Sequence, residues 1–376
     1  MYPRPAIATP SRARAGRATP THRAGHPGVL DRVSRVGYYV HHHGVGHRHR
    51  FQAIAAASPD IDFVPISELE IDDGVLLPSD VPDSAPTDPT AGGQLHWAPL
   101  DAHTATPRLK TIVDWIASAR PSGVVVDVSV EMVLACRLAG VPTVVVRQHG
   151  DRIDPAHALA FGCAARLMAP FPSEFETSAD PRLIAKTEHV GFIAPPHPTD
   201  TTDTTDTDSP SPCAGPDDVV VLWGRGGGRL SGATLDAIAA ATPGRVFCAG
   251  VGIWTPDDPP TSPDVVDLGW VDDPRTLLRE GPLVVGSCGN NNVALVASAE
   301  CPFVAVPQDR PFDEQLRLAE AMEATGVAVL APGSDDAGEW HDAISTARRR
   351  SGRWSRLETP FDGAATAGDV IRRWLT

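Results

Sequence analysis

The stretch Arg35–Ala57, "RVGYYVHHHGVGHRHRFQAIAAA", decides the fold. It opens with a short apolar run typical of a β-strand and passes through two glycines, Gly44 and Gly46. It then continues as a helix whose apolar residues recur with helical spacing. Glycine permits a tight turn and lets a ligand approach the backbone closely. The stretch therefore predicts a strand, a glycine turn and a helix in direct succession.

The same alternation continues along the chain on both sides of a polar segment. Before the segment, apolar runs predict strands at 61–66, 123–128, 142–148 and 166–171. After it, further runs predict strands at 218–224, 244–250, 265–270, 282–288, 302–307 and 326–332. Helical patterns lie between the strands, as at 109–118 and 130–140. Nearly continuous apolar strands alternating with helices indicate parallel sheets covered on both faces.

The polar segment, "APPHPTDTTDTTDTDSPSPCAGPDD" at 194–218, is too rich in Thr, Asp, Pro and Ser to build a core. We therefore predict an α/β protein with two Rossmann-like domains, at 35–194 and 218–376, joined by a linker at 195–217. The last helix of the second domain could pack back on the first domain. A ligand cleft is expected between the domains, beyond the carboxyl ends of the strands.

Composition excludes several classes of protein. No apolar run approaches the ~18–20 residues that span a bilayer, and residues 1–34 lack the apolar segment of a secretory signal. The net charge is −15, although residues 1–50 carry nine arginines and a single acidic residue. An acidic body argues against a nucleic-acid partner. The basic tail at 1–34 is expected to be disordered, with contact to anionic lipid or nucleic acid as the alternative. Peripheral membrane contact is not otherwise indicated.

The six cysteines are scattered and form no C-x-x-C pair, so we expect reduced thiols in a cytoplasmic protein. The histidine run also fails as a metal site. Successive side chains of a strand point to opposite faces, so His41, His42 and His43 cannot close on one ion. No matching acidic, histidine or cysteine spacing accompanies them, and no metal is expected.

His47 is the histidine of interest, because it lies on the first turn of the predicted helix. The positive end of the helix dipole disfavours an imidazolium, so the ring stays neutral and can accept a proton. Asp127 ends the strand at 123–128, where its carboxylate faces the cleft and can orient a histidine. The alternatives are a purely structural glycine turn and an Asp127 that caps the next helix.

Two further stretches suit a phosphate ligand. "LWGRGGGRLSG" at 222–232 is neither a Walker loop nor G-x-G-x-x-G, yet its three glycines and Arg225 suit a diphosphate. Asn291 and Asn292 open a helix after the strand at 282–288, where free N–H groups and side-chain amides fit phosphate. Asp313, Glu314 and Gln315 follow the next strand and can bond sugar hydroxyls. Each reading has an alternative. The glycine stretch could be a flexible loop, the asparagines could cap the helix, and Asp313 to Gln315 could belong to a solvated loop.

Together these residues resemble the GT-B glycosyltransferases over about residues 35–376, and most of all the MurG-like and UDP-glycosyltransferase families. Gly46-His47 resembles their amino-terminal glycine-histidine loop. "VVVRQHGDRIDPAHALAFGCAARLMAPFP" at 144–172 is similar to the acceptor-domain segment of the MurG-like enzymes, and "WGRGGGRLSG" to their glycine loop. "SCGNNNVAL…CPFVAVPQ…DEQ" resembles the donor signature of the family.

The resemblance implies transfer of a hexosyl or N-acetylhexosaminyl group from a nucleotide-diphosphate donor to an acceptor hydroxyl, with inversion and without a metal or other cofactor. The acceptor would be a small molecule, a lipid-linked molecule or a glycan. His47 would be the general base, oriented by Asp127. The implied donor-binding residues are Arg225, Gly226, Gly227, Gly228, Gly289, Asn291 and Asn292 for the diphosphate, Trp270 and Val271 for the base, and Asp313 and Gln315 for the sugar. The implied acceptor-binding residues are Gly44, Gly46, Gln148 and His149.

The sequence also departs from the family. Leu295 aligns with the glutamate that binds the ribose, and Arg147 replaces a glutamate of the MurG-like pattern. A peptidoglycan acceptor is therefore not implied. Two other functions stay open. A nucleotide-sugar 2-epimerase shares the fold but requires cleft carboxylates that the sequence does not single out. A non-catalytic sugar-nucleotide or glycan-binding protein would tolerate Leu295.

Overall fold

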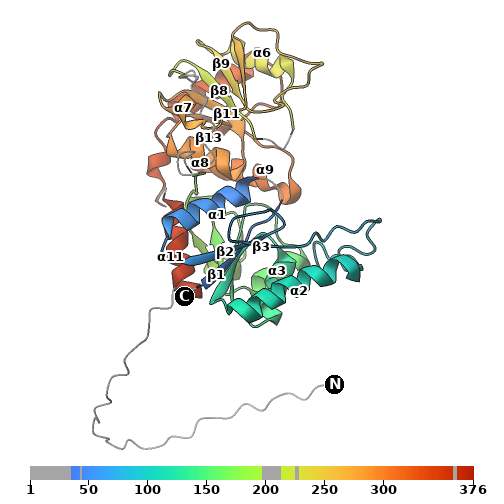
Figure 1. The fold of residues 1–376 in the computed structure, drawn as a ribbon. Coiled ribbons are helices and arrows are strands. Elements are labelled where there is room, and N and C mark those ends of the chain that lie inside the picture. Colours follow the sequence, from blue (N-terminus) through green and yellow to red (C-terminus); the bar gives the residue numbers. More distant parts are fainter. Residues whose placement is uncertain (1–34, 43–44, 197–212, 225–227, 359–361) are drawn as a thin grey trace, which may run out of the picture. The chain divides into compact units, whose positions relative to one another are not determined.

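The computed structural model describes residues 35–42, 45–196, 213–224, 228–358 and 362–376. The predicted tail at 1–34 and most of the predicted linker lie outside this part of the chain. Within it, no helix has both the length and the apolar character needed to cross a membrane. The described residues form two sheets, and every pair of neighbouring strands runs parallel (Figure 1).

The first sheet has seven strands in the order β3-β2-β1-β4-β5-β6-β7. These are β1 (Arg35–Tyr39), β2 (Asp62–Ser67), β3 (Val75–Leu76), β4 (Gly123–Asp127), β5 (Thr143–Val146), β6 (Arg166–Ala169) and β7 (Thr187–His189). The helices along this part are α1 (Val45–Ala57), α2 (Ala102–Ala119), α3 (Val130–Leu138), α4 (Pro155–Cys163) and α5 (Pro181–Lys186). Central strands of β-branched residues bury both faces, as β4 shows. Val124 and Val126 pack with α2, α3 and α4, whereas Val125 packs with α1 on the other face.

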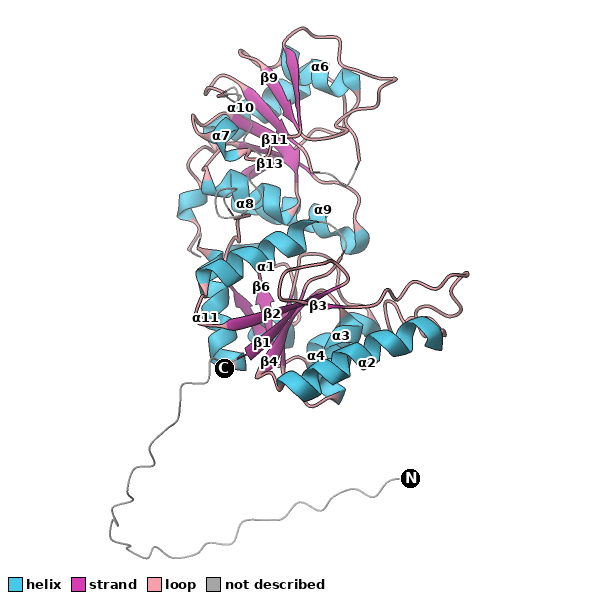
Figure 2. Ribbon diagram, viewed as in Figure 1, coloured by secondary structure: helices cyan, strands magenta, loops and turns pink. Residues whose placement is uncertain are grey.

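The second sheet has six strands in the order β10-β9-β8-β11-β12-β13. These are β8 (Val219–Leu222), β9 (Val246–Ala249), β10 (Val265–Gly269), β11 (Leu283–Ser287), β12 (Phe303–Val306) and β13 (Ala328–Leu330). Its helices are α6 (Gly232–Ala240), α7 (Arg275–Leu278), α8 (Asn290–Ser298), α9 (Glu314–Thr325) and α10 (Ala337–Arg349). α7, α8 and α9 share one apolar core with the sheet, and α6 and α10 share the other (Figure 2).

The last helix, α11 (Gly363–Leu375), packs on the first sheet although it follows the second in sequence. Val370 and Ile371 join the core that contains α1, and the two helices are in contact (Figure 1). Gly123 makes room for this helix, because a Cβ at that position would come within 2.4 Å of the Leu375 side chain. The chain thus returns to the first sheet at its end.

The structure confirms the predicted α/β class and every predicted strand, with ends shifted by a residue or two. The pattern missed β3 and β7, which are only two and three residues long and lie at the two edges of the sheet. Asp127 does not cap the following helix, so that alternative is wrong. Ser129 caps α3 instead, by accepting a hydrogen bond from the Met132 N–H.

Candidate active site

α1 begins at Val45, a few residues after the end of β1, and carries His47 on its first turn. Nδ1 of His47 lies 3.0 Å from Oδ1 of Asp127, the last residue of β4. β1 and β4 are paired in parallel, so the helix that follows β1 starts beside the carboxyl end of β4. Nε2 is then the ring nitrogen left to meet a ligand. The sheet topology therefore joins two residues that are 80 positions apart in sequence.

Asp127 is fully buried and has a second, stronger partner that the sequence analysis did not name. Nη1 of Arg50 donates to both carboxylate oxygens at 2.7 Å, and Arg50 is itself only 5% exposed. Burial by itself would raise the pKa of Asp127, but Arg50 and then His47 outweigh it and hold that pKa at about 2. Asp127 is therefore a carboxylate across the physiological range. His47 and Arg50 reach it together because positions three apart in sequence lie on one face of a helix.

The start of α1 also meets the start of α8, the helix that follows β11 of the second sheet. The side-chain amide nitrogen of Asn291 lies 3.2 Å from Nδ1 of His49. A Cβ on Gly46 would lie 3.8 Å from the same amide. Burial, followed by the charge of Arg48, lowers the pKa of His49, which favours a neutral ring that accepts the amide hydrogen bond. The N-termini of two helices thus lie close together, and the first turn of α8 has no side-chain cap, an arrangement suited to an anion.

Two predicted donor-binding side chains are bonded within the second sheet. The amide of Asn292 donates to Oγ of Ser287 at 2.8 Å and to the carbonyl of Leu222 at 3.3 Å. Gln315 is 5% exposed, and its Oε1 accepts from the N–H groups of Cys288 and Gln308, each at 3.0 Å. These bonds tie together the ends of β8, β11 and β12. The capping alternative for the asparagines is wrong, since Gly289 occupies the N-cap of α8 and no side chain caps it.

Of the remaining predicted donor residues, Gly228, Trp270 and Val271 lie outside helices and strands, and Asp313 ends the short 3-10 helix Pro311–Asp313. Trp270 is 43% exposed and its ring N–H donates to Asp272 at 2.9 Å, while Val271 packs partly against the core. Asp313 is exposed and has a left-handed backbone, with φ at 53°. Gly228 is exposed and its carbonyl accepts from the Trp223 ring at 2.9 Å. Arg225, Gly226, Gly227 and the acceptor residue Gly44 lie outside the described residues.

The predicted acceptor residues Gln148 and His149 follow β5 and are buried, with 8% and 3% of their surface exposed. The His149 ring packs on Phe171 at 3.8 Å between centroids, and burial, followed by Arg147, lowers its pKa to about 3. Arg147 is buried too and forms two 2.6 Å hydrogen bonds with Glu176. The residue that departs from the MurG-like pattern is therefore part of an internal ion pair. Leu295, the other departure, is 5% exposed and belongs to an apolar core.

Glu314 brings a second carboxylate to the surroundings of His47. It starts α9, and its Oε2 accepts from Arg152 at 2.8 Å. Burial raises the pKa of Glu314 against the opposing charges of Arg152, Arg50, His47 and Arg310. The neighbouring backbone is held as well, because the Asp151 N–H donates to the Phe312 carbonyl at 2.7 Å. Gly150 is required there, since a Cβ would come within 2.5 Å of that carbonyl and φ is 112°.

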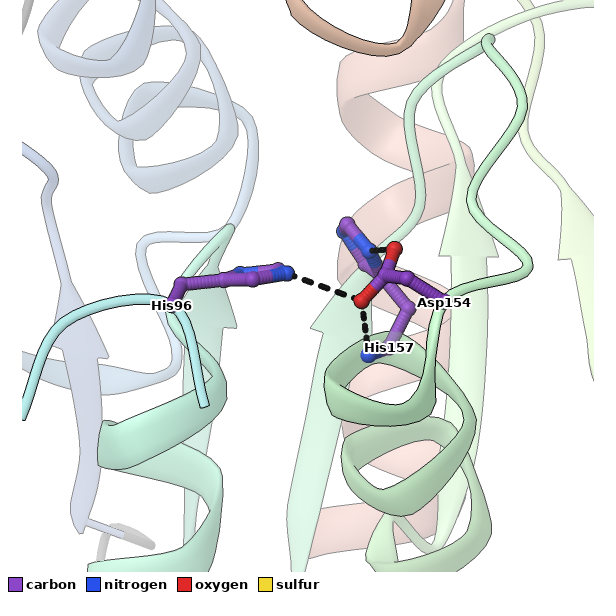
Figure 3. Close-up of side chains that lie close together, drawn as sticks. All are labelled: His96, Asp154 and His157. Carbon is purple, nitrogen blue, oxygen red and sulfur yellow. Dashed lines mark hydrogen bonds and ion pairs between the residues drawn. The ribbon is translucent and has the colours of Figure 1, made fainter. Parts of the chain in front are cut away.

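His96, Asp154 and His157 form a group with the residue types of a metal site (Figure 3). Nδ1 of His157 lies 2.5 Å from one carboxylate oxygen, and Nε2 of His96 lies 3.1 Å from the other. Nε2 of His157 lies 3.1 Å from Arg152, whose guanidinium can only donate. Nδ1 of His157 therefore carries the proton and donates to Asp154. This nitrogen then has no lone pair to offer a metal ion. The geometry is that of a hydrogen-bond network, which the sequence analysis did not foresee.

Comparisons with known proteins place this arrangement among solved folds. No family profile matches the chain, and no curated protein matches it. It is similar to the structure of the glycotransferase of kitacinnamycin, with 16% identity, a TM-score of 0.63 and coverage of 92% of this chain and 100% of that one. A UDP-glucosyltransferase from Polygonum tinctorium gives 13% identity, a TM-score of 0.64 and coverage of 92% and 100%.

MurG from Acinetobacter baumannii is also similar, at 15% identity and a TM-score of 0.61, and the match covers 90% of this chain and 99% of that one. These matches cover 90% or more of this chain, and they include two of the enzyme types that the motifs resemble. At these identities the likeness establishes the fold. The chain has the GT-B fold, with two Rossmann-like sheets in the arrangement found in nucleotide-sugar glycosyltransferases.

Proposed function

We propose that the protein is a glycosyltransferase that moves a sugar from a nucleotide-diphosphate donor to an acceptor hydroxyl. One observation carries this proposal. In a GT-B fold, His47 on the first turn of α1 lies 3.0 Å from Asp127 at the end of β4. An imidazole whose Nδ1 lies beside a carboxylate presents Nε2 to an incoming hydroxyl. The start of α8 lies close by and suits the diphosphate.

In the proposed reaction, the acceptor oxygen attacks the anomeric carbon of the donor while Nε2 of His47 takes the hydroxyl proton. The bond from the anomeric carbon to the diphosphate oxygen breaks, and its electron pair leaves with the nucleoside diphosphate. A single in-line displacement inverts the configuration at the anomeric carbon. The negative charge on the leaving group is stabilised by the N–H groups at the start of α8 and by the Asn291 amide. The step needs no metal.

For the substrates, we propose a hexosyl or N-acetylhexosaminyl donor and an acceptor that is a small molecule, a lipid-linked molecule or a glycan. A small-molecule acceptor has the most support, since solved structures with this fold are described with a spinosyn aglycone and with pterostilbene. Related structures are described with thymidine diphosphate and with a UDP-sugar analogue. We propose a cytoplasmic location as well, in keeping with six cysteines that are all free thiols.

The first experiment identifies the donor and then removes the base. A thermal-shift screen against UDP, dTDP and GDP detects binding, because a ligand at a hundred times its dissociation constant adds about 2.7 kcal/mol of stability. Incubation with labelled sugar nucleotides and a panel of hydroxylated acceptors follows. We expect His47→Ala to lower transfer by about 10²–10⁴-fold while nucleotide binding is kept.

His341→Ala is the matched control, since this histidine is exposed on α10 of the second sheet. Undiminished turnover in His47→Ala contradicts the proposed base. Exchange of the sugar epimers without transfer would identify an epimerase, and binding without any turnover would identify a non-catalytic binding protein. If none of the three nucleotides raises the thermal stability of the protein, the proposed donor class is contradicted.

A further inference from the structure

Arg50 has no role in the proposed reaction as stated above, yet it is the closest partner of Asp127. Its Nη1 contacts both carboxylate oxygens at 2.7 Å, and both side chains are buried. An unpaired carboxylate in such a place is costly, and without Arg50 its nearest cationic partner would be a protonated His47. Arg50 therefore supplies the positive charge that compensates Asp127 in the interior.

His47 and Arg50 share one oxygen of Asp127. Oδ1 accepts from Arg50 at 2.7 Å and lies 3.0 Å from Nδ1 of His47. The contact to His47 is the longer of the two and lacks the alignment of a hydrogen bond. His47 therefore faces a carboxylate whose charge is already compensated by a guanidinium. This differs from a histidine beside a lone aspartate, where the carboxylate stabilises the imidazolium.

A second carboxylate near His47 is compensated in the same way. Glu314, on α9, interacts electrostatically with His47 and Arg50 and forms a 2.8 Å ion pair with Arg152. Arg310 adds a further positive charge from the loop before α9. On the side of β1, the groups that face the pair are the Tyr38 hydroxyl, whose pKa is raised by burial, and the ring of His41, 5.5 Å from that of His47. Asp127 and Glu314 thus each have an arginine as a partner.

We propose that Arg50 is a positioning residue for the base: it fixes the Asp127 carboxylate beside His47 and offsets its charge, so that His47 faces a compensated carboxylate when it accepts the proton. The inference rests on the proposed function for its catalytic meaning. The effect of Arg50 on the protonation of His47 can be measured without any substrate.

The experiment measures the pKa of His47 by NMR titration in labelled protein, with the resonance assigned from its absence in His47→Gln. Arg50→Met leaves Asp127 uncompensated, and we expect the pKa of His47 to rise by about one unit, a tenfold shift in its protonation equilibrium. Asp127→Asn leaves Arg50 uncompensated and should lower the same pKa. The double variant Arg50→Met with Asp127→Asn removes both charges and should return it close to the wild-type value.

The double variant also protects the test from misfolding, because replacing both members of a buried ion pair is tolerated far better than replacing one. Arg50→Lys keeps the charge and should shift the pKa least. Arg48→Met is the matched control, since Arg48 lies on the same helix but is exposed. A pKa of His47 that is equal in Arg50→Met and in wild type overturns the proposal, as does a fall in Arg50→Met or an equal shift in Arg48→Met.

Activity provides the second measurement. In Arg50→Met, the acidic limb of the pH profile of kcat/KM should move to higher pH by the shift seen in the titration, while the rate at high pH recovers. A uniform loss at every pH indicates a merely structural role and overturns the proposal. If no transfer is found in any variant but the pKa order holds, then the proposed function fails while the role of Arg50 in setting the charge of His47 stands.

Discussion

The polar residues at the carboxyl ends of the two sheets are used in different ways. In the first sheet, side chains of opposite charge pair with one another: Asp127 with Arg50, and Arg147 with Glu176. In the second sheet, the amide side chains of Asn292 and Gln315 bond to backbone groups or a hydroxyl of the same sheet. A charge beside a charge alters how its neighbours bind protons, whereas an amide on the backbone mainly fixes shape.

The difference suggests a division of labour within the fold. In the proposed reaction, the first sheet supplies the groups that exchange protons, and the second supplies backbone N–H groups for the diphosphate. Three substitutions test this comparison, because charge pairs and amide hydrogen bonds should differ in how much stability their removal costs. Removing one member of a buried ion pair should cost most, removing a buried amide acceptor less, and removing the part-buried amide donor of Asn291 least.

The largest effect is expected for Arg147→Met. Both members of its pair with Glu176 are nearly buried, and Arg147 also donates to Thr187 at 3.0 Å. The variant leaves a carboxylate in the interior beside His189, at 3.3 Å, and the Ser178 N–H, which donates to it at 2.8 Å. We expect the free energy of unfolding at pH 7 to fall by about 3 kcal/mol in urea titrations. A loss below 1 kcal/mol would show that the charge pairs of the first sheet matter no more than surface pairs.

The pH dependence of stability provides the control for this pair. Burial by itself would raise the pKa of Glu176, but the hydrogen bonds from Arg147 and His189 outweigh it and lower that pKa. Because the folded state has the lower pKa, the pair stabilises the protein above the ordinary glutamate pKa of about 4.3, and this contribution is lost as the pH falls below it. Arg147→Met should lose less stability than wild type over the same acid range. The double variant with Glu176→Met should recover most of the loss at pH 7.

An intermediate effect is expected for Gln315→Leu. The substitution removes the acceptor of two N–H groups, those of Cys288 and Gln308, which are buried residues. We expect a loss of about 2 kcal/mol in the free energy of unfolding, because unsatisfied buried donors retain their desolvation cost. Gln315→Glu keeps an oxygen at the same position and should lose less. If Gln315→Leu changes the affinity for a sugar nucleotide and leaves stability as it was, the side chain serves the ligand and not the sheet.

The sequence alone was sufficient for the architecture. Val-rich runs such as those of β4, β5 and β8 predicted buried strands because both faces of a parallel strand need apolar residues. The rule that carboxyl ends of parallel strands share one edge then predicted that His47 and Asp127 belong to one region, and they lie 3.0 Å apart. β3 and β7 were not predicted, because a strand of two or three residues is too short to show an apolar pattern.

The partners of the predicted residues were much harder to foresee. Arg50 stands three residues after His47, a spacing that places both on one helix face, but it was hidden among the nine arginines of residues 1–50. Glu176 lies 29 residues from Arg147, and no local pattern links them. For Gln315, an amide with donors and an acceptor fits a sugar and a backbone equally well. Only tertiary structure decides which partner each side chain has.

The smallest effect is expected at the one asparagine that departs from this comparison. Asn291 belongs to the second sheet's α8, yet its amide bonds to His49 of α1. If the amide also binds the diphosphate, as proposed, Asn291→Ala should weaken UDP or dTDP binding about fivefold, equivalent to about 1 kcal/mol, and leave stability within about 0.5 kcal/mol. Isothermal titration in a His49→Ala background separates the two roles of Asn291. A persistent loss there means that the amide contacts the nucleotide directly. A loss that disappears with His49 means that Asn291 acts through that ring, and the proposed diphosphate contact is then wrong.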